Sequence, residues 1–157
     1  MKQHFTFDWG RTGGPGILLA SGLKGYATNR RDVGGITTFW CFLGNGSTWR
    51  LECVMNDLGD WEEVGSLVFW DASEEMTLPE MLPLPPQWAQ IESIDKLVVQ
   101  VDEFCADSGL VLTNRAGDEL TIVCGANVCA MAVRAPFFEG EFFPEFAMER
   151  YQRVPMM

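Results

Sequence analysis

The apolar residues of this chain fall in many short runs separated by turn residues, a pattern typical of antiparallel strands. Two runs, residues 36–43 and 47–55, flank Gly44-Asn45-Gly46. Asn-Gly favours a two-residue hairpin turn, in which the numbers of paired residues would sum to 91 and Cys41 would face Arg50. We therefore expect one core face and one mixed face. The expected core face carries Trp40, Phe42, Trp49, Leu51, Cys53 and Met55.

Further segments have the length and β-branched content of strands. They are residues 64–70, 95–101, 110–113, 120–124 and 128–133, of which 64–70 reads as a buried strand and the last three as a meander. A helix fits 95–101 almost as well as a strand, and we take the strand. A three-residue loop at 115–117, with Gly117 in the left-handed position, would place Leu112 opposite Leu120 on one apolar face.

The remaining segments are shorter or rich in proline. We expect short strands at 17–20 and 24–28, and a crossing loop, polyproline-like in part, at 79–86. Short helices are expected at 87–90, after Pro86, and at 145–151, after Pro144. The predicted fold is mainly β: a single antiparallel β domain over residues 1–157, either a sandwich or a partly open barrel, with one or two short helices.

Composition agrees with one globular domain, because 157 residues with 47% apolar content suffice to bury a core. The N-terminus lacks an apolar leader, and no apolar run approaches the roughly 20 residues of a membrane span. Five cysteines, an odd number without a paired framework, indicate a reducing compartment. We therefore expect a cytoplasmic protein in which Cys124 and Cys129 are buried strand thiols rather than a disulfide or half of a zinc site.

Charge is segregated along the sequence. Residues 1–50 carry six Lys or Arg and two acids, a net charge of +4, whereas residues 51–110 carry fourteen acids and one Lys, a net charge of −13. The whole chain has a net charge of −11. Such a field attracts a cationic partner and repels nucleic acid and anionic membranes, so we expect a basic protein as partner, with no nucleic acid and no membrane.

No catalytic or cofactor motif stands out. His4 is the only histidine, and an exposed or strand-edge position is expected for it rather than a catalytic triad. The glycines at 10–16 lack the Lys-Ser/Thr of a phosphate-binding loop, and the acids at 57–63 lack the spacing of a calcium-binding loop. We therefore expect no enzyme, no cofactor and no metal site.

Carboxylates interleaved with aromatic residues are the remaining signal, since interfaces combine aromatic anchors with a charged rim. Trp61 is flanked by acids just after a Gly59 turn, which suits an exposed anchor. The candidate partner-binding residues are Asp57, Asp60, Trp61, Glu62, Glu63, Asp71, Glu74, Glu75, Asp102 and Glu103.

These observations predict a non-catalytic acidic module that docks a basic protein, such as a cationic toxin or nuclease. Small acidic inhibitors, immunity proteins among them, use the same physics, and the analogy is one of charge and size. One alternative is a β barrel that binds a small apolar ligand in a cavity lined by Trp40, Phe42, Trp49 and Leu51. A carboxylate- or metal-dependent hydrolase is a further, less favoured alternative.

Overall fold

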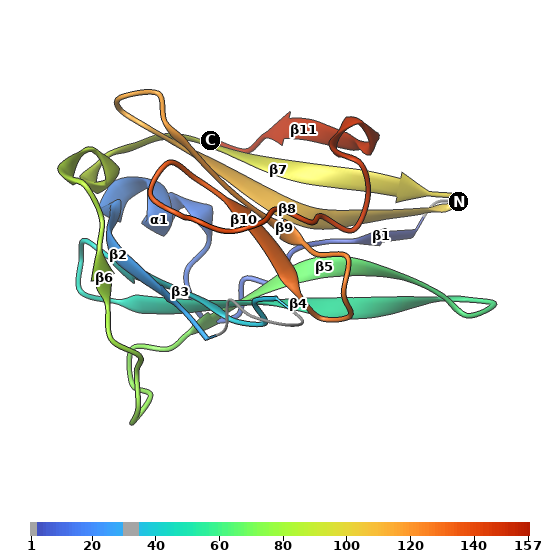
Figure 1. The fold of residues 1–157 in the computed structure, drawn as a ribbon, viewed down its shortest axis with the longest axis horizontal. Helices are drawn as coiled ribbons and strands as arrows, with labels where there is room; N and C mark the ends of the chain where they lie inside the picture. Colours follow the sequence, from blue (N-terminus) through green and yellow to red (C-terminus); the bar gives the residue numbers. More distant parts are fainter. Residues whose placement is uncertain (1–2, 30–34) are drawn as a thin grey trace.

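The described part of the chain folds as two facing β-sheets, one α-helix and two single-turn 3-10 helices (Figure 1). The computed structural model describes residues 3–29 and 35–157. Strands account for 54% of the residues and helices for 9%, so the expected mainly β class is confirmed in its sandwich form. In the described ranges, no helix combines the length and the hydropathy that crossing a bilayer requires.

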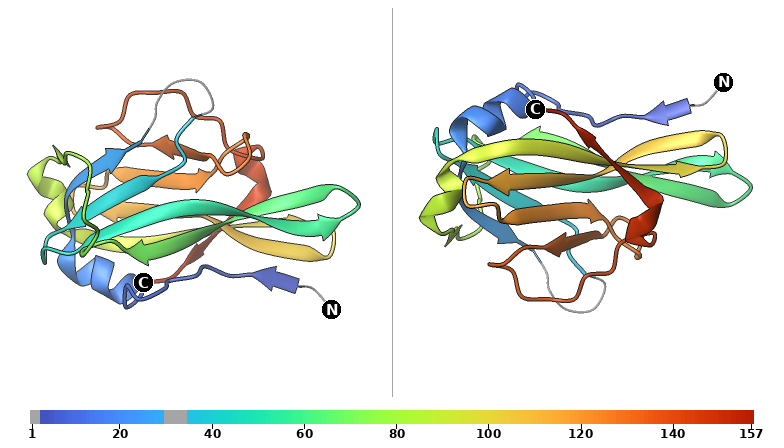
Figure 2. Two further views of the ribbon diagram at one scale, coloured as in Figure 1. Left: turned by 90° about the horizontal axis from the view of Figure 1, so that it is seen from below. Right: turned by 90° about the horizontal axis from the view of Figure 1, so that it is seen from above.

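Sheet A has the strand order β10-β9-β8-β7-β11, with β1 paired to β8 (Figure 2). The neighbours along this order pair antiparallel where their register is defined, whereas β1 pairs parallel with β8. The strands are β1 (Gln3–Phe5), β7 (Ile91–Val101), β8 (Phe104–Asn114), β9 (Glu119–Cys124), β10 (Met131–Arg134) and β11 (Tyr151–Pro155).

Sheet B has the order β5-β4-β3-β2-β6, and all its pairs are antiparallel. Its strands are β2 (Leu23–Thr28), β3 (Phe39–Leu43), β4 (Thr48–Gly59), β5 (Glu62–Asp71) and β6 (Leu82–Pro83). The strands predicted at 24–28 and 64–70 are thus confirmed as β2 and β5. The proline-rich segment contributes only the two-residue edge strand β6, as the missing proline donors require.

The β3–β4 hairpin has a different register from the predicted one. Its loop holds three residues, 44–46, closed by a 2.9 Å hydrogen bond from the Leu43 N–H to the Ser47 carbonyl, with Gly46 at φ +92°. Cys41 therefore lies opposite Trp49, not Arg50. Because one residue of slip exchanges the two faces of a strand, the prediction for β3 was wrong. Phe39 and Cys41 face the core.

The loop at 115–117 joins β8 and β9 as predicted. Leu112 pairs with Leu120, and Gly117 takes a φ of +88°. The predicted strands at 95–101, 110–113 and 120–124 are confirmed within the longer β7, β8 and β9, and the third strand of the meander is β10.

Residues 17–20 are helical, so the strand expected there was wrong. They belong to α1 (Pro15–Ser21), which has Pro15 at its first turn. Gly22 ends the helix at φ +65° and donates its N–H to the Leu18 carbonyl at 3.0 Å. A Cβ on Gly22 would lie 2.1 Å from the Ala89 carbonyl oxygen, so proline at the start and glycine at the end determine this helix.

The helix predicted at 145–151 was also wrong, because only the single turn η2 (Met148–Arg150) forms before strand β11. Pairing with β7 outweighs the helical pattern, and Tyr151 lies opposite Val99. Arg153 therefore binds Glu119, with 2.7 Å between guanidinium and carboxylate, as well as Asp95. The single turn expected after Pro86 is present as η1 (Pro86–Ala89).

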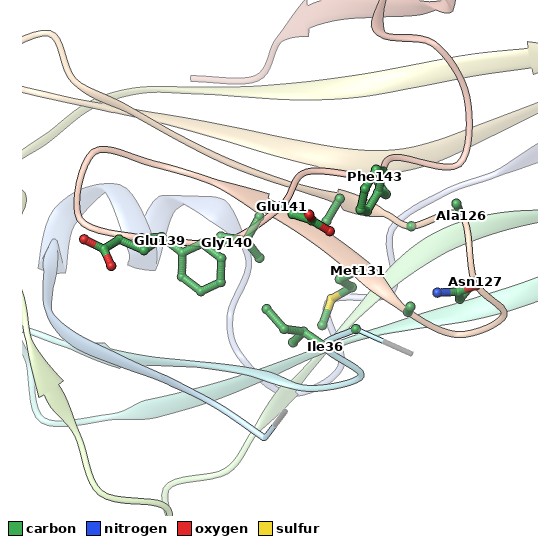
Figure 3. Close-up of a pocket in the computed structure, with 14 residues that line it drawn as sticks. Ile36, Ala126, Asn127, Met131, Glu139, Gly140, Glu141 and Phe143 are labelled. Carbon is green, nitrogen blue, oxygen red and sulfur yellow. The ribbon is translucent and has the colours of Figure 1, made fainter. Parts of the chain in front are cut away.

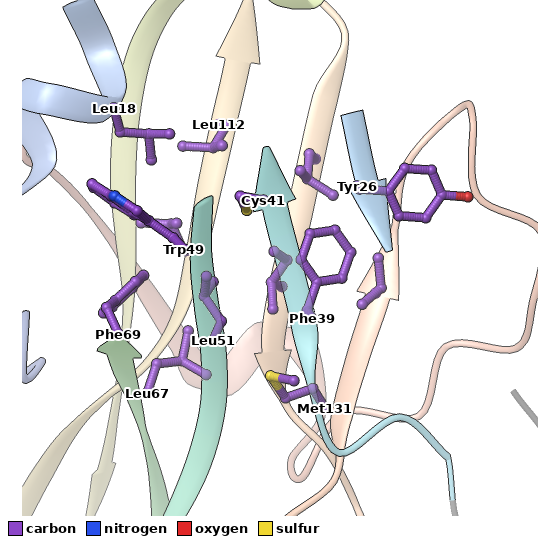
Figure 4. Packing of buried hydrophobic residues seen from close by; sticks show 14 of the residues in the cluster. Leu18, Tyr26, Phe39, Cys41, Trp49, Leu51, Leu67, Phe69, Leu112 and Met131 are labelled. Carbon is purple, nitrogen blue, oxygen red and sulfur yellow. The ribbon is translucent and has the colours of Figure 1, made fainter. Parts of the chain in front are cut away.

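The main core lies between the sheets and includes residues from β3, β4, β5 and α1 (Figure 4). Trp49, Leu51 and Phe69 are each about 1% exposed, so this space is filled by side chains. A second apolar cluster includes Leu97, Val99 and Tyr151, with partly buried residues of the 142–148 segment packed against it.

All five cysteines are free thiols. Cys124 is buried in β9 as expected, but Cys129 is exposed at φ +59° in the turn before β10, so the prediction of a buried thiol was wrong there. Burial raises the pKa of the Cys41 thiol to about 12. Its thiolate is therefore scarce at neutral pH.

Candidate functional site

Two long hairpins, β4–β5 from sheet B and β7–β8 from sheet A, reach the same end of the sandwich (Figures 1 and 2). The turns of these hairpins and the strand residues next to them include seven of the ten candidate residues. This group, called the hairpin end below, consists of Asp57, Asp60, Trp61, Glu62, Glu63, Asp102 and Glu103. Residues 45 or so apart in the sequence are thereby brought to one end of the molecule.

The body of the protein anchors β5 immediately behind the hairpin end. Asp8 exchanges backbone hydrogen bonds with Leu67 and Phe69, the latter at 2.8 Å from the Phe69 N–H to the Asp8 carbonyl. The Gly65 N–H donates to the Glu145 carboxylate at 3.1 Å, and the Ser108 hydroxyl donates to the Gly65 carbonyl at 2.6 Å. The edge of β5 is therefore sealed from residue 65 to 69, and the hairpin end lies beyond this anchor.

Trp61 occupies an unusual conformation at the tip of β4–β5. Asp60 and Trp61 are the two turn residues, with φ of +51° and +65°, and Gly59 pairs with Glu62 on either side of them. Positive φ at both positions is the geometry of a tight hairpin turn that normally uses Asn-Gly or Gly-Gly. A bulky side chain at positive φ is an outlier that costs of order 1–3 kcal/mol.

No packing offsets that cost. Trp61 has a relative exposure of 104%, so the whole indole lies in solvent. Neither backbone preference nor folding therefore explains a tryptophan at this turn.

Six exposed carboxylates lie at the same end of the molecule as the indole, and within the described ranges none of them forms an ion pair. The Asp57 carboxylate instead accepts the Gly59 N–H at 2.8 Å, which orders the strand before the turn. Like charges that have no ion-pair partner among the described residues produce a negative potential at this end, which accelerates encounter with cations.

The other three candidate residues, Asp71, Glu74 and Glu75, lie at the opposite end of β5. Ten residues of strand separate the two groups by about 30 Å. The Asp71 carboxylate accepts the Ser73 N–H at 3.0 Å, and hydrogen bonds from Ser73 lower its pKa. Glu75 binds Arg50, so this end has a local counter-charge. The candidate residues do not form one surface.

Sequence reasoning missed a cluster around Asp107, which is 2% exposed in β8. The His4 Nε2 lies 2.7 Å from its Oδ1, the Phe7 N–H donates to its Oδ2 at 3.2 Å, and the Lys96 Nζ lies 3.4 Å away. His4 belongs to the edge strand β1, as expected. A separation of 103 residues leaves no local signal for such a contact.

The residues expected to line an apolar cavity in the alternative prediction are divided between the core and the outer face of sheet B. Trp49 and Leu51 belong to the filled core, and Trp40 lies on the outer face of sheet B. Among the residues that the structure describes, no three His, Cys, Asp or Glu side chains are grouped so as to hold a metal ion.

The chain matches no protein-family model, and no curated protein or solved structure gives a significant match. The surface geometry of the chain is therefore the guide to its function.

Proposed function

We propose that this chain is a non-catalytic binding module whose hairpin end docks a basic protein. The observation that supports it is Trp61, a fully exposed indole held in a strained turn among carboxylates. Strain that folding does not require clusters at functional sites, and exposed aromatics with a charged rim are typical of binding hot spots.

The two kinds of side chain have separate tasks in this proposal. The carboxylates raise the rate of encounter with a cationic surface, whereas burial of the indole lengthens the life of the complex. Trp61 extends from a paired, anchored hairpin, so little backbone freedom is lost when it binds. The Asp102 turn of the second hairpin, at φ +53°, adds carboxylates from sheet A at the same end of the molecule (Figure 1).

The partner class follows from the charge. A net charge of −11, with −13 in residues 51–110, favours a strongly basic protein over nucleic acid or anionic lipid. Cationic toxins and nucleases fit this description, so an inhibitor or immunity-type role is the specific form of the proposal.

The test is the salt dependence of association. Purified cationic nucleases, with any basic protein encoded beside this chain, are passed over the immobilised protein at about 10 to 300 mM salt. The association rate constant of a true partner should fall at least tenfold over this range, because the screening length shrinks from about 30 Å to below 8 Å.

Two matched double variants locate the effect. Glu62→Gln with Glu63→Gln should reduce the association rate at low salt about fivefold and flatten its salt dependence. Glu74→Gln with Glu80→Gln removes the same charge outside the hairpin end and should change the rate less than twofold. Absence of binding across the panel, or equal effects of the two pairs, would contradict the proposal.

A further inference from the structure

A separate cavity of about 490 Å³ lies beside β10, under the loop that follows it (Figure 3). Ile36, Met131 and Val133 supply a floor that is at most 5% exposed, and Phe138 and Phe143 supply walls. This volume falls within the range of small-molecule sites, and its predominantly apolar lining is typical of them.

Backbone hydrogen bonds hold the walls of this cavity in place. The Met131 N–H donates to the Ile36 carbonyl at 2.7 Å, which joins β10 to the segment before β3. The Ala126 N–H donates to the Phe143 carbonyl at 2.9 Å, which joins the turn before β10 to the loop after β10. A cavity with such walls is largely preformed, so a ligand need not order it.

Among the residues that the structure describes, the charged groups of the lining have one sign. Its ionisable side chains are Glu139 and Glu141, and the described residues that line it include no Lys, Arg or His. Arg134 is the basic residue of β10, and its guanidinium lies 4.5 Å from the centre of the Phe142 ring. The described lining therefore favours a cation over fatty acids, nucleotides and other anions.

Figure 3 distinguishes the two carboxylates. Glu141 is drawn between Gly140 and Phe143, whereas the Glu139 side chain points away from the other labelled residues. Glu141 is thus the side chain placed to meet a positive charge. Phe143 is 62% exposed, so its ring has surface free to cover a ligand.

We propose that this cavity binds a small organic cation with an apolar or aromatic body. The body lies against Ile36, Met131 and Phe143, and the ammonium group meets Glu141. This site is independent of the hairpin end, so either proposal stands or fails without the other.

Three probes with one carbon skeleton test the proposal: 4-phenylbutylamine, 4-phenylbutanol and 4-phenylbutyrate. Calorimetric titration in low salt should show the amine binding at least about tenfold more tightly than the carboxylate, with the alcohol between them. Amide chemical-shift changes should centre on Ile36, Met131 and Phe143.

Two variants separate the charge from the apolar contact. Glu141→Gln should weaken the amine about tenfold and leave the alcohol unchanged, whereas Phe143→Ala should weaken both about fivefold. Glu149→Gln in η2 removes one exposed charge elsewhere and serves as the control. The proposal is overturned if no probe binds, if the carboxylate binds as well as the amine, if the shifts map elsewhere, or if either variant behaves like the control.

Discussion

The two ends of strand β5 hold the same types of residue in opposite states. At the Asp71 end, Trp70 is 45% exposed in a regular strand, and the Arg50 guanidinium lies 5.7 Å from the centre of its ring. Arg50 also binds Glu75 and lies 3.4 Å from the Glu52 carboxylate. Arg50 thus contacts the aromatic ring and two carboxylates within the chain.

At the hairpin end the aromatic ring and the carboxylates recur, and within the described ranges these carboxylates have no ion-pair partner. Trp61 is fully exposed at positive φ, and no described base pairs with the acids around it. The difference between the ends suggests what a partner would supply: a basic group for the carboxylates and a surface to cover the indole.

The largest expected effect lies in the core next to the Asp71 end, where Trp49 of β4 pairs with Asp71 of β5. Trp49→Ala removes a side chain that is 1% exposed and should lower the free energy of unfolding by about 3–5 kcal/mol. Trp40 lies on the opposite face of sheet B in the observed register, so Trp40→Ala should lower the free energy of unfolding by only about 1–2 kcal/mol. Urea denaturation measures both, and equal losses would contradict the observed register of β3.

The next prediction makes the same substitution at each end and expects opposite signs. Trp70→Gly should lower the free energy of unfolding by about 2 kcal/mol, because glycine weakens a strand and the contact with Arg50 is lost. Trp61→Gly should raise it by about 1 kcal/mol, because glycine accepts the positive φ without strain. Thermal and urea unfolding of the two variants test this.

Trp61→Ala is the control for that pair, since alanine keeps the strain and removes only the exposed indole. It should change the free energy of unfolding by less than about 0.5 kcal/mol. If Trp61→Gly instead destabilises the protein, the turn is not strained and the contrast between the ends fails.

The smallest effect concerns the anchor behind the hairpin end. Burial raises the pKa of Glu145 above its ordinary value of 4.5, partly offset by the hydrogen bond from the Gly65 N–H. A raised folded-state pKa means that this carboxyl favours folding below its unfolded pKa, and that the contribution is lost as pH rises through the folded pKa.

Glu145→Gln keeps an acceptor for Gly65 and removes the titration. The variant should therefore gain stability relative to the native chain between about pH 4 and pH 7, by less than about 1 kcal/mol. Urea unfolding of both proteins across this range measures the difference. A variant that loses stability relative to the native chain as pH rises would show that the charged form is favoured.

The sequence predicted the class of fold well and the details of its turns unevenly. The loop at 115–117 and the one at 44–46 have the same length and the same final glycine, yet only the first was predicted correctly. Asn45-Gly46 has the pattern of a two-residue turn, and apolar residues on both faces of β3 gave no contrast to correct the register. The prediction of a C-terminal helix was wrong because this segment pairs with β7, which is distant in the sequence.

The candidate site was predictable in charge and not in shape. The acidic segment is visible in the sequence, and the strand predicted at 64–70 already separates its two groups of carboxylates. The positive φ of Trp61 was not visible, because no glycine or asparagine occupies that turn position. The placement of Asp102 at the same end as the β4–β5 tip (Figures 1 and 2) depends on how two sheets pack, which a sequence pattern does not encode.

The most direct test of the central claim is the effect of Trp61→Ala on affinity for the basic protein that shows the steepest salt dependence. Affinity should fall by about 2 kcal/mol or more, roughly 30-fold, mainly through faster dissociation, while the free energy of unfolding stays unchanged. An unchanged affinity, or a loss of affinity that accompanies unfolding, would contradict the assignment of Trp61 as the anchor.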